Sequence, residues 1–237
     1  MSHFNLIDPI IAVDTMRDDK LVQSRLKTPR AAAIAGILFS ALFVAAFSLL
    51  RISVPSDPTE SGEWLKTSSI SVGFALNLLP FAGIAFLWFV GALRDRLGVL
   101  EDRFFSTVFL GSSLLFLAML FTSAAAIGAI IVAFAADPNN LTNSAAFYLA
   151  RTLAYNLANI YMVKMAGVFM ISTSTVVVST DIAPRWVAFV GFFLALLLLF
   201  GSSYLSWIFV AFPLWVLLIS VCFLIDEFRR RPAKTSL

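Results

Sequence analysis

Residues 186–225 read WVAFVGFFLALLLLFGSSYLSWIFVAFPLWVLLISVCFLI, forty consecutive residues without a charged side chain. A helix needs about 20 apolar residues to cross the hydrocarbon core of a bilayer, so this run is too long for one span. Near its midpoint, residues 201–206 (GSSYLS) are of the glycine- and serine-rich type found in turns. We therefore predict two helices here, over 186–201 and 206–225, joined by a tight hairpin.

The rest of the chain has the same character. Of its 237 residues, 60% are hydrophobic and 13% are charged, with a mean hydropathy of +0.92, whereas soluble domains are about 25% charged. Backbone groups in lipid must be hydrogen-bonded internally, and long apolar runs without alternation exclude a barrel. The sequence predicts an all-α polytopic transmembrane helical bundle with six spans: about 31–50, 68–93, 104–136, 144–180, 186–201 and 206–225.

The distribution of Lys and Arg predicts the orientation, because cytoplasmic loops are enriched in both. Five lie within 17–30, three within 94–103, one at 185 and four within 229–234, against Arg51 and Lys66 on the other side. We therefore expect both termini in the cytoplasm, with residues 226–237 as a basic cytoplasmic tail. The expected location is the plasma membrane, taken as a bacterial inner membrane, with the lipid bilayer and no nucleic acid as a partner.

Residues 1–30 form the predicted cytoplasmic N-terminal segment. Asp8-Pro9 is typical of a helix start. Two alternatives stay open for the residues that follow: an amphipathic helix lying on the inner membrane surface, or a solvated charged tail.

The chain has few residues of the kinds that bind metals or catalyse reactions. Cys222 and His3 are its single cysteine and single histidine, which excludes an internal disulfide, a His/Cys zinc site and bis-histidine haem. No acidic residue lies within any of the predicted spans, including the fourth, which contains Arg151 and Lys164. We therefore expect no metal, no cofactor and no enzymatic activity.

The fourth span is unusually polar, and a charged residue inside a span is by default a functional candidate. Helical spacing sorts its polar residues into two stripes on roughly opposite faces. The first consists of Tyr148, Arg151, Tyr155 and Asn159, and the second of Tyr161, Lys164, Ser172, Thr175 and Ser179.

The second stripe is the leading candidate to line a pore or bind a ligand, because a fixed cation such as Lys164 favours anions. The alternative is structural. The long third and fourth helices would project from the membrane, Arg151 would lie in water near Asp137, and Lys164 would extend to the interface. The serine and threonine hydroxyls would then bond to their own helix.

Three further residues are predicted to act in helix kinks or packing. Pro80 and Pro213 lie within spans, and Asn77, three residues before Pro80, can bond a neighbouring helix or a carbonyl freed by the proline. Small residues four apart, such as Gly36 with Ser40, predict close helix contacts; Ala124 with Gly128 and Gly191 with Ala195 show the same spacing.

Together these patterns favour a small channel or transporter for an anion or small polar solute, acting as a homo-oligomer or with a membrane-protein partner. The alternative is a non-transporting membrane scaffold or a subunit of a larger membrane complex.

Overall fold

The computed structural model describes residues 9–60, 62–97, 103–138, 140–180, 184–201 and 207–230, and these residues contain helices and turns but no strand. The predicted turn at 202–206 and most of the basic tail lie outside these ranges. The helices are α1 (Pro9–Ser53), α2 (Trp64–Leu97), α3 (Arg103–Ala136), η2 (Leu141–Asn143), α4 (Ala145–Asn156), η3 (Leu157–Tyr161), α5 (Met162–Thr180), α6 (Arg185–Gly201), η4 (Ile208–Val210) and α7 (Ala211–Arg230).

The all-helical membrane fold is confirmed, because five helical segments in the described part of the chain are long and apolar enough to span a bilayer. One of them, Ala145–Ser179, runs without interruption through α4, η3 and α5. A sixth apolar helix, α6, has 17 residues and is shorter than the others. The run over 186–225 does contain two separate helices, α6 and α7, as its length predicts.

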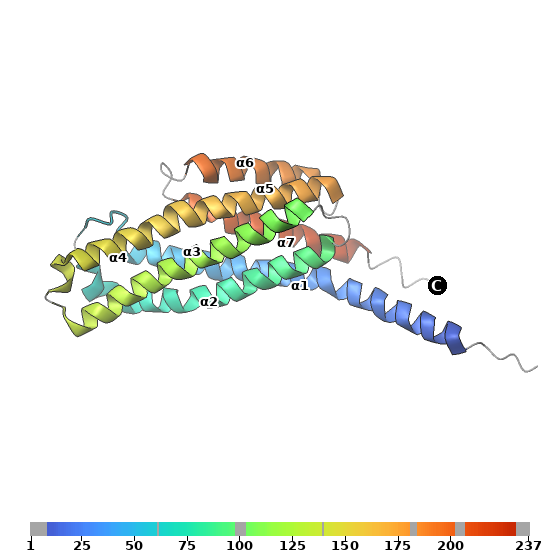
Figure 1. Ribbon diagram of the computed structural model, residues 1–237, viewed down its shortest axis with the longest axis horizontal. Coiled ribbons are helices and arrows are strands. Elements are labelled where there is room, and N and C mark those ends of the chain that lie inside the picture. The colour runs from blue at the N-terminus through green and yellow to red at the C-terminus, as the bar shows by residue number, and fades with distance from the viewer. Residues whose placement is uncertain are drawn as a thin grey trace, which may run out of the picture.

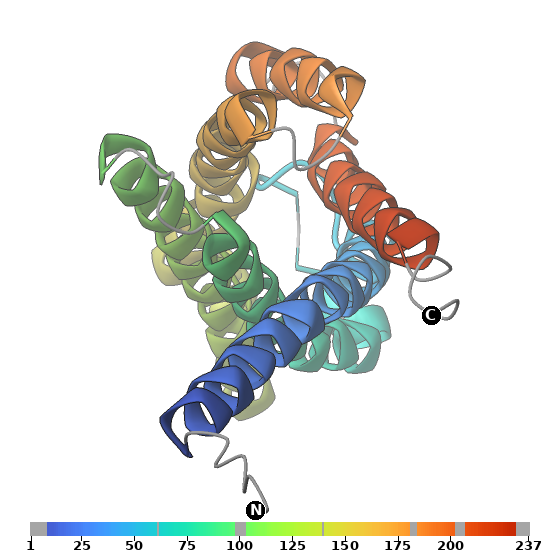
Figure 2. The same ribbon diagram turned by 90° about the vertical axis from the view of Figure 1, so that its right-hand side faces the viewer.

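The helices form a closed bundle seen end-on in Figure 2. In it α1 packs along α2 and α7, α3 packs along α2 and α5, and α6 packs along α5. Helix α1 is continuous from Pro9, so the N-terminal segment extends the first span as one helix of 45 residues. Its first half reaches beyond the bundle at the end where α7 finishes (Figure 1).

Five fully buried phenylalanines fill the centre of the bundle, each from a different helix: Phe39, Phe86, Phe116, Phe169 and Phe212. Their ring centroids lie close together, at 4.9 Å for Phe39 with Phe86 and 4.9 Å for Phe116 with Phe212. Tilted and edge-on pairs of this kind add about 0.5–1.5 kcal/mol beyond the burial of their area. The axis of the bundle is therefore closed by packed rings.

A second, smaller core lies at the opposite end from the α1 extension. Trp64, Leu65 and Val72 of α2 pack there against Ile130 of α3 and Phe147 of α4. Figure 1 shows that α4 and the start of α2 extend past the end of α6 on this side. The 34 residues of α3 correspond to roughly 51 Å of helix, against a hydrocarbon core of about 30 Å.

Two glycines allow the closest helix approaches. A Cβ at Gly36 would overlap Ser220 of α7 and would lie 2.9 Å from a ring carbon of Phe89. A Cβ at Gly191 would overlap Ser174 and would lie 2.7 Å from Nε1 of Trp215. The small-residue pairs beginning at Gly36 and Gly191 are therefore confirmed as close helix contacts.

Candidate functional site

The first polar stripe of the fourth span points into a pocket. Arg151, Tyr155 and Asn159 all line a pocket of about 100 Å³, which is bordered by α1, α2, α3, α4, η3 and the connection between α1 and α2. Tyr148 belongs to the same stripe in the sequence but is 38% exposed and lies against the ring of Phe147. Three of the four residues of the first stripe therefore line the same pocket.

Arg151 is the most constrained residue of the site. Although it carries a full charge, only 3% of its surface is exposed. Its Nη2 donates to the backbone oxygens of Pro55 and Asp57, both at 2.9 Å, and its guanidinium carbon lies 5.6 Å from the centroid of the Trp64 ring. The predicted alternative, in which Arg151 is solvated, does not fit this burial. Through these two hydrogen bonds Arg151 instead connects α4 to the α1–α2 connection at the pocket.

One nitrogen of the Arg151 guanidinium lacks a hydrogen-bond acceptor. Its Nη1 is buried without a hydrogen bond, and so is Nε1 of the adjacent Trp64. A buried donor that lacks an acceptor costs about 1–3 kcal/mol, and more when it is charged. A ligand or water that accepts from Nη1 would remove that cost.

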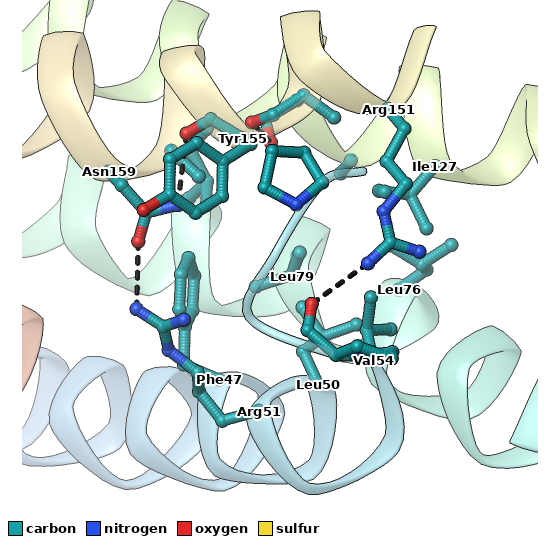
Figure 3. Close-up of a pocket in the computed structure, with 17 residues that line it drawn as sticks. Phe47, Leu50, Arg51, Val54, Leu76, Leu79, Ile127, Arg151, Tyr155 and Asn159 are labelled. Atoms are coloured by element: carbon teal, nitrogen blue, oxygen red, sulfur yellow. Dashed lines mark hydrogen bonds between the residues drawn. The ribbon is translucent and has the colours of Figure 1, made fainter. Parts of the chain in front are cut away.

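Arg51 supplies a second guanidinium from the end of α1. Its Nη2 donates to Oδ1 of Asn159 at 2.9 Å, and its guanidinium carbon lies 5.7 Å from the centroid of the Phe209 ring. Figure 3 shows Arg51 extending from α1 towards Asn159, while Arg151 extends from α4 towards the α1–α2 connection. The pocket lies between these two cationic groups.

The helix that carries Asn159 changes its geometry at this point. Residues Leu157–Tyr161 form a π-helical turn, η3, between α4 and α5. Nδ2 of Asn159 donates to the Tyr155 oxygen at 2.9 Å, and Oγ of Ser123 on α3 donates to the Ala154 oxygen at 2.8 Å. Both bonds satisfy carbonyls beside the widened turn. Such π turns occur frequently at functional sites, and this one lies at the wall of the pocket.

The pocket is otherwise apolar. Its lining includes six large apolar side chains: Phe47, Leu50, Leu76, Leu79, Leu120 and Ile127. The lining residues include two arginines and no carboxylate. An apolar space with two cationic groups is complementary to an anion that carries an apolar body.

Two acidic residues of the α1–α2 connection, Glu60 and Asp57, act electrostatically on Arg151, Glu60 more strongly than Asp57, and neither of them lines the pocket. Asp57 is exposed, and its Oδ1 accepts hydrogen bonds from the hydroxyl and the backbone N–H of Thr59, at 2.7 and 2.8 Å. These two bonds lower the pKa of Asp57, with a smaller lowering from the charge of Arg151. Asp57 thus contributes its backbone oxygen to Arg151 and keeps its carboxylate engaged by Thr59.

The second polar stripe does not form one site. Tyr161 is 55% exposed and Lys164 is exposed on the outside of the bundle, whereas Ser172 is 2% exposed. The hydroxyls of Ser172 and Thr175 bond to oxygens four residues earlier, those of Val168 and Ile171, at 3.0 and 2.9 Å. The hydroxyl of Ser179 contacts the oxygens of Thr175 and Val176, both at 3.1 Å. These bonds match the structural alternative for the hydroxyls, and the five residues lie outside the pocket.

The three residues predicted for kinks and packing have different surroundings. Asn77 is exposed and its Nδ2 donates to the Gly73 oxygen at 2.9 Å. Pro80 lies inside α2, so it frees the oxygen of Leu76 and not the oxygen that Asn77 contacts. Pro213 is the third residue of α7, where a missing N–H costs little. Its oxygen accepts from Oγ of Ser40 at 2.8 Å and so connects α7 to α1.

Comparisons of the chain with protein-family profiles, with curated proteins and with solved structures gave no match. The class of protein is therefore defined by its own fold: a helical membrane protein with several spans. Its functional assignment depends on the geometry of the pocket.

Proposed function

We propose that this membrane protein is a transporter for small organic anions, which bind in the pocket between Arg51 and Arg151. The observation that carries the proposal is the pairing of two guanidinium groups with an apolar lining that contains no carboxylate. An arginine presents a planar set of donors that matches a carboxylate or a sulfonate. The ligand class is accordingly an anionic group on a short apolar body.

The energetics of the site support an anionic ligand. Burying a charge is costly unless it is paired, and Arg151 is almost completely buried with one guanidinium nitrogen lacking an acceptor. Glu60 and Asp57 act on Arg151 electrostatically from outside the pocket, so the contribution that an anion beside that nitrogen would add is the missing acceptor. The pocket volume of about 100 Å³ is well above the roughly 10–15 Å³ that one water requires, so a small ligand can be accommodated.

A moving carrier fits the packing better than an open channel does. The five central phenylalanines leave no straight path along the axis of the described bundle, and the pocket lies beside the end of α1 and the α1–α2 connection. Passage of a ligand therefore requires the helices to separate. Loss of the Arg151 bonds to the α1–α2 connection would open the pocket on its own side, which is the outer side in the orientation that the Lys and Arg distribution predicts.

The site of transport differs from the one favoured by the sequence. Lys164 and Tyr161 point away from the pocket, while Arg51 was assigned only to an external connection. In this proposal the polar stripe of Arg151, Tyr155 and Asn159 forms the binding wall. Lys164 contacts lipid headgroups or water through its flexible side chain.

Uptake into proteoliposomes tests the proposal. The probe is labelled 1-butanesulfonate, which stays ionised at neutral pH and so leaks little, with valinomycin and potassium to hold the potential. Saturable uptake above that of empty liposomes is expected for the wild type and for Lys164→Met, and loss is expected for Arg51→Gln. Absence of uptake by the wild type, or loss in Lys164→Met alone, would overturn the assignment of the pocket.

The alternative, a non-transporting scaffold or subunit, has one specific observation in its favour. The outer face of α6 exposes Trp186, Phe189, Phe193 and Phe200, at 53%, 66%, 62% and 77%. Lipid contact explains these residues equally well, because outward side chains of a membrane bundle face acyl chains. If the protein is a scaffold or a subunit, a stoichiometric partner should copurify with it from native membranes. That partner should be lost when Phe189 and Phe193 are both replaced by alanine.

A further inference from the structure

The outer face of α2 carries a regular row of exposed residues. Counting from Ile70, the positions follow one another at steps of four, three, four, three and four residues: Ile70, Phe74, Asn77, Phe81, Ile84 and Trp88. The five apolar members are 52% to 89% exposed, and Asn77 is exposed as well. Alternating steps of three and four residues define the seam by which one helix winds around another. We call this row the α2 seam.

Asn77 is the anomaly in the α2 seam. It lies near the middle of the span Trp64–Asp95, among side chains that face outwards. Its one described hydrogen bond runs from Nδ2 to the Gly73 oxygen. The carboxamide therefore retains a second N–H and its own oxygen for another partner. A polar group at this depth costs free energy when it faces hydrocarbon without a hydrogen-bond partner. The cost is much smaller when it forms a hydrogen bond with a second polar group.

We propose that the α2 seam is the interface with a second copy of this chain, and that the two Asn77 carboxamides pair across it. A membrane protein inserts in one orientation, so two copies are related by a two-fold axis along the membrane normal. Such an axis brings identical residues of parallel helices to the same depth. A carboxamide is both a donor and an acceptor, so Asn77 complements the partner's Asn77.

The surface beside the α2 seam is shaped to receive side chains. A shallow groove of about 360 Å³ runs between α2 and α3, and its lining combines the larger side chains of Leu76, Pro80 and Phe121 with the small residues Ala124, Ala125 and Gly128. The missing side chain at Gly128 leaves its position open, since the nearest atom to a Cβ there is a methyl of Leu76 at 3.8 Å. In helix pairing, large side chains of one helix insert into spaces between side chains of the other. The aromatic side chains of the α2 seam can insert in this way, and the space beside the small residues of the groove can receive such a side chain from a second copy.

Disulfide trapping in native membranes tests the pairing. Asn77→Cys and Leu196→Cys are each made in a Cys222→Ser background, so that a single thiol is present. Leu196 is the matched control because it is 52% exposed within α6, on the other side of the bundle (Figure 2). Oxidation with copper phenanthroline is expected to yield a covalent dimer for Asn77→Cys and little for Leu196→Cys. Equal yields from the two variants, or cross-linking of Asn77→Cys to a different polypeptide, would overturn the proposal.

A second measurement keeps the asparagine in place. Dimerisation of the dye-labelled protein is followed by energy transfer as the protein is diluted with lipid. Asn77→Leu is expected to raise the dimer dissociation constant about three- to tenfold, and Asn77→Gln to raise it less, because interhelical polar bonds in membranes are modest. A wild type that stays monomeric at all dilutions, or equal constants for all three proteins, would contradict pairing through Asn77. Because no residue of the α2 seam lines the pocket, neither result depends on anion transport.

Discussion

Nη2 of Arg51 donates a hydrogen bond to Oδ1 of Asn159 across 2.9 Å, and this bond joins the end of α1 to the π-helical turn η3. The two residues are 108 positions apart, so the contact exists only in the folded bundle. Because Nδ2 of Asn159 is held by the Tyr155 oxygen, its oxygen is presented to the guanidinium. This arrangement fixes Arg51 at the edge of the pocket.

A double-mutant cycle measures that contact. Arg51→Gln and Asn159→Leu should each destabilise the protein, and the double variant should lose less than the sum of the two. A hydrogen bond to a charged group contributes about 1.5–3 kcal/mol, so a coupling free energy of this order is expected from thermal or denaturant unfolding in detergent. Strict additivity would show that the two side chains do not interact.

Arg151→Leu should loosen the α1–α2 connection. The substitution leaves the oxygens of Pro55 and Asp57 without their donor, which we expect to cost about 1–3 kcal/mol of stability. Limited proteolysis should cut the connection faster than in the wild type, and the unfolding temperature should fall. Lys164→Met serves as the control, because Lys164 is exposed on the outside of the bundle. Matching proteolysis rates for the two variants would argue against the fastening role of Arg151.

Gly36→Ala should destabilise the packing of α1 on α7. The added methyl overlaps Ser220 and crowds Phe89, and overpacking of this kind costs about 1–3 kcal/mol. Gly73→Ala is the matched control, because nothing lies within 4 Å of a Cβ at that position. The control should be neutral or slightly stabilising, since alanine favours a helix. A Gly36→Ala protein that unfolds at the temperature of the control would refute the close approach.

Thr59→Val should raise the pKa of Asp57 towards its ordinary value. In the folded protein the Thr59 hydroxyl and N–H lower this pKa, and the variant removes the hydroxyl bond. A carboxyl with a lowered folded pKa contributes stability that is present above its unfolded pKa and is lost as the pH falls through the folded pKa. A carboxyl-carbon NMR titration of Asp57 provides the measurement. An identical titration midpoint in Thr59→Val would contradict the assigned cause.

The membrane fold was predictable because lipid restricts the backbone so strongly. The charge-free length of 186–225 requires two helices, which the structure contains, and the helical repeat groups Arg151, Tyr155 and Asn159, which line one pocket. Both predictions depend on one helix at a time. Length and period are local properties, and local properties can be read from the sequence.

The partners of those residues could not be predicted in the same way. Arg51 ends an apolar run, and the sequence shows only a boundary charge, because its partner Asn159 lies far along the chain. The burial of Arg151 depends on the path of the α1–α2 connection. This segment is irregular, and its prolines and glycine do not allow that path to be predicted from the sequence. The depth and the orientation of Lys164 could not be predicted from the sequence, and in the structure its side chain is exposed. The π turn was not predicted either, and the bond from Ser123 of α3 to the carbonyl beside it joins residues 31 positions apart.

A direct binding measurement tests most closely whether a small organic anion binds between Arg51 and Arg151. Titration calorimetry of the purified protein with butyrate should give saturable binding to the wild type and to Lys164→Met. Arg51→Gln should weaken it at least tenfold, because truncating one partner of a buried charged contact costs about 2–5 kcal/mol. Absence of binding to the wild type, or equal affinity in Arg51→Gln, would contradict an anion site between Arg51 and Arg151.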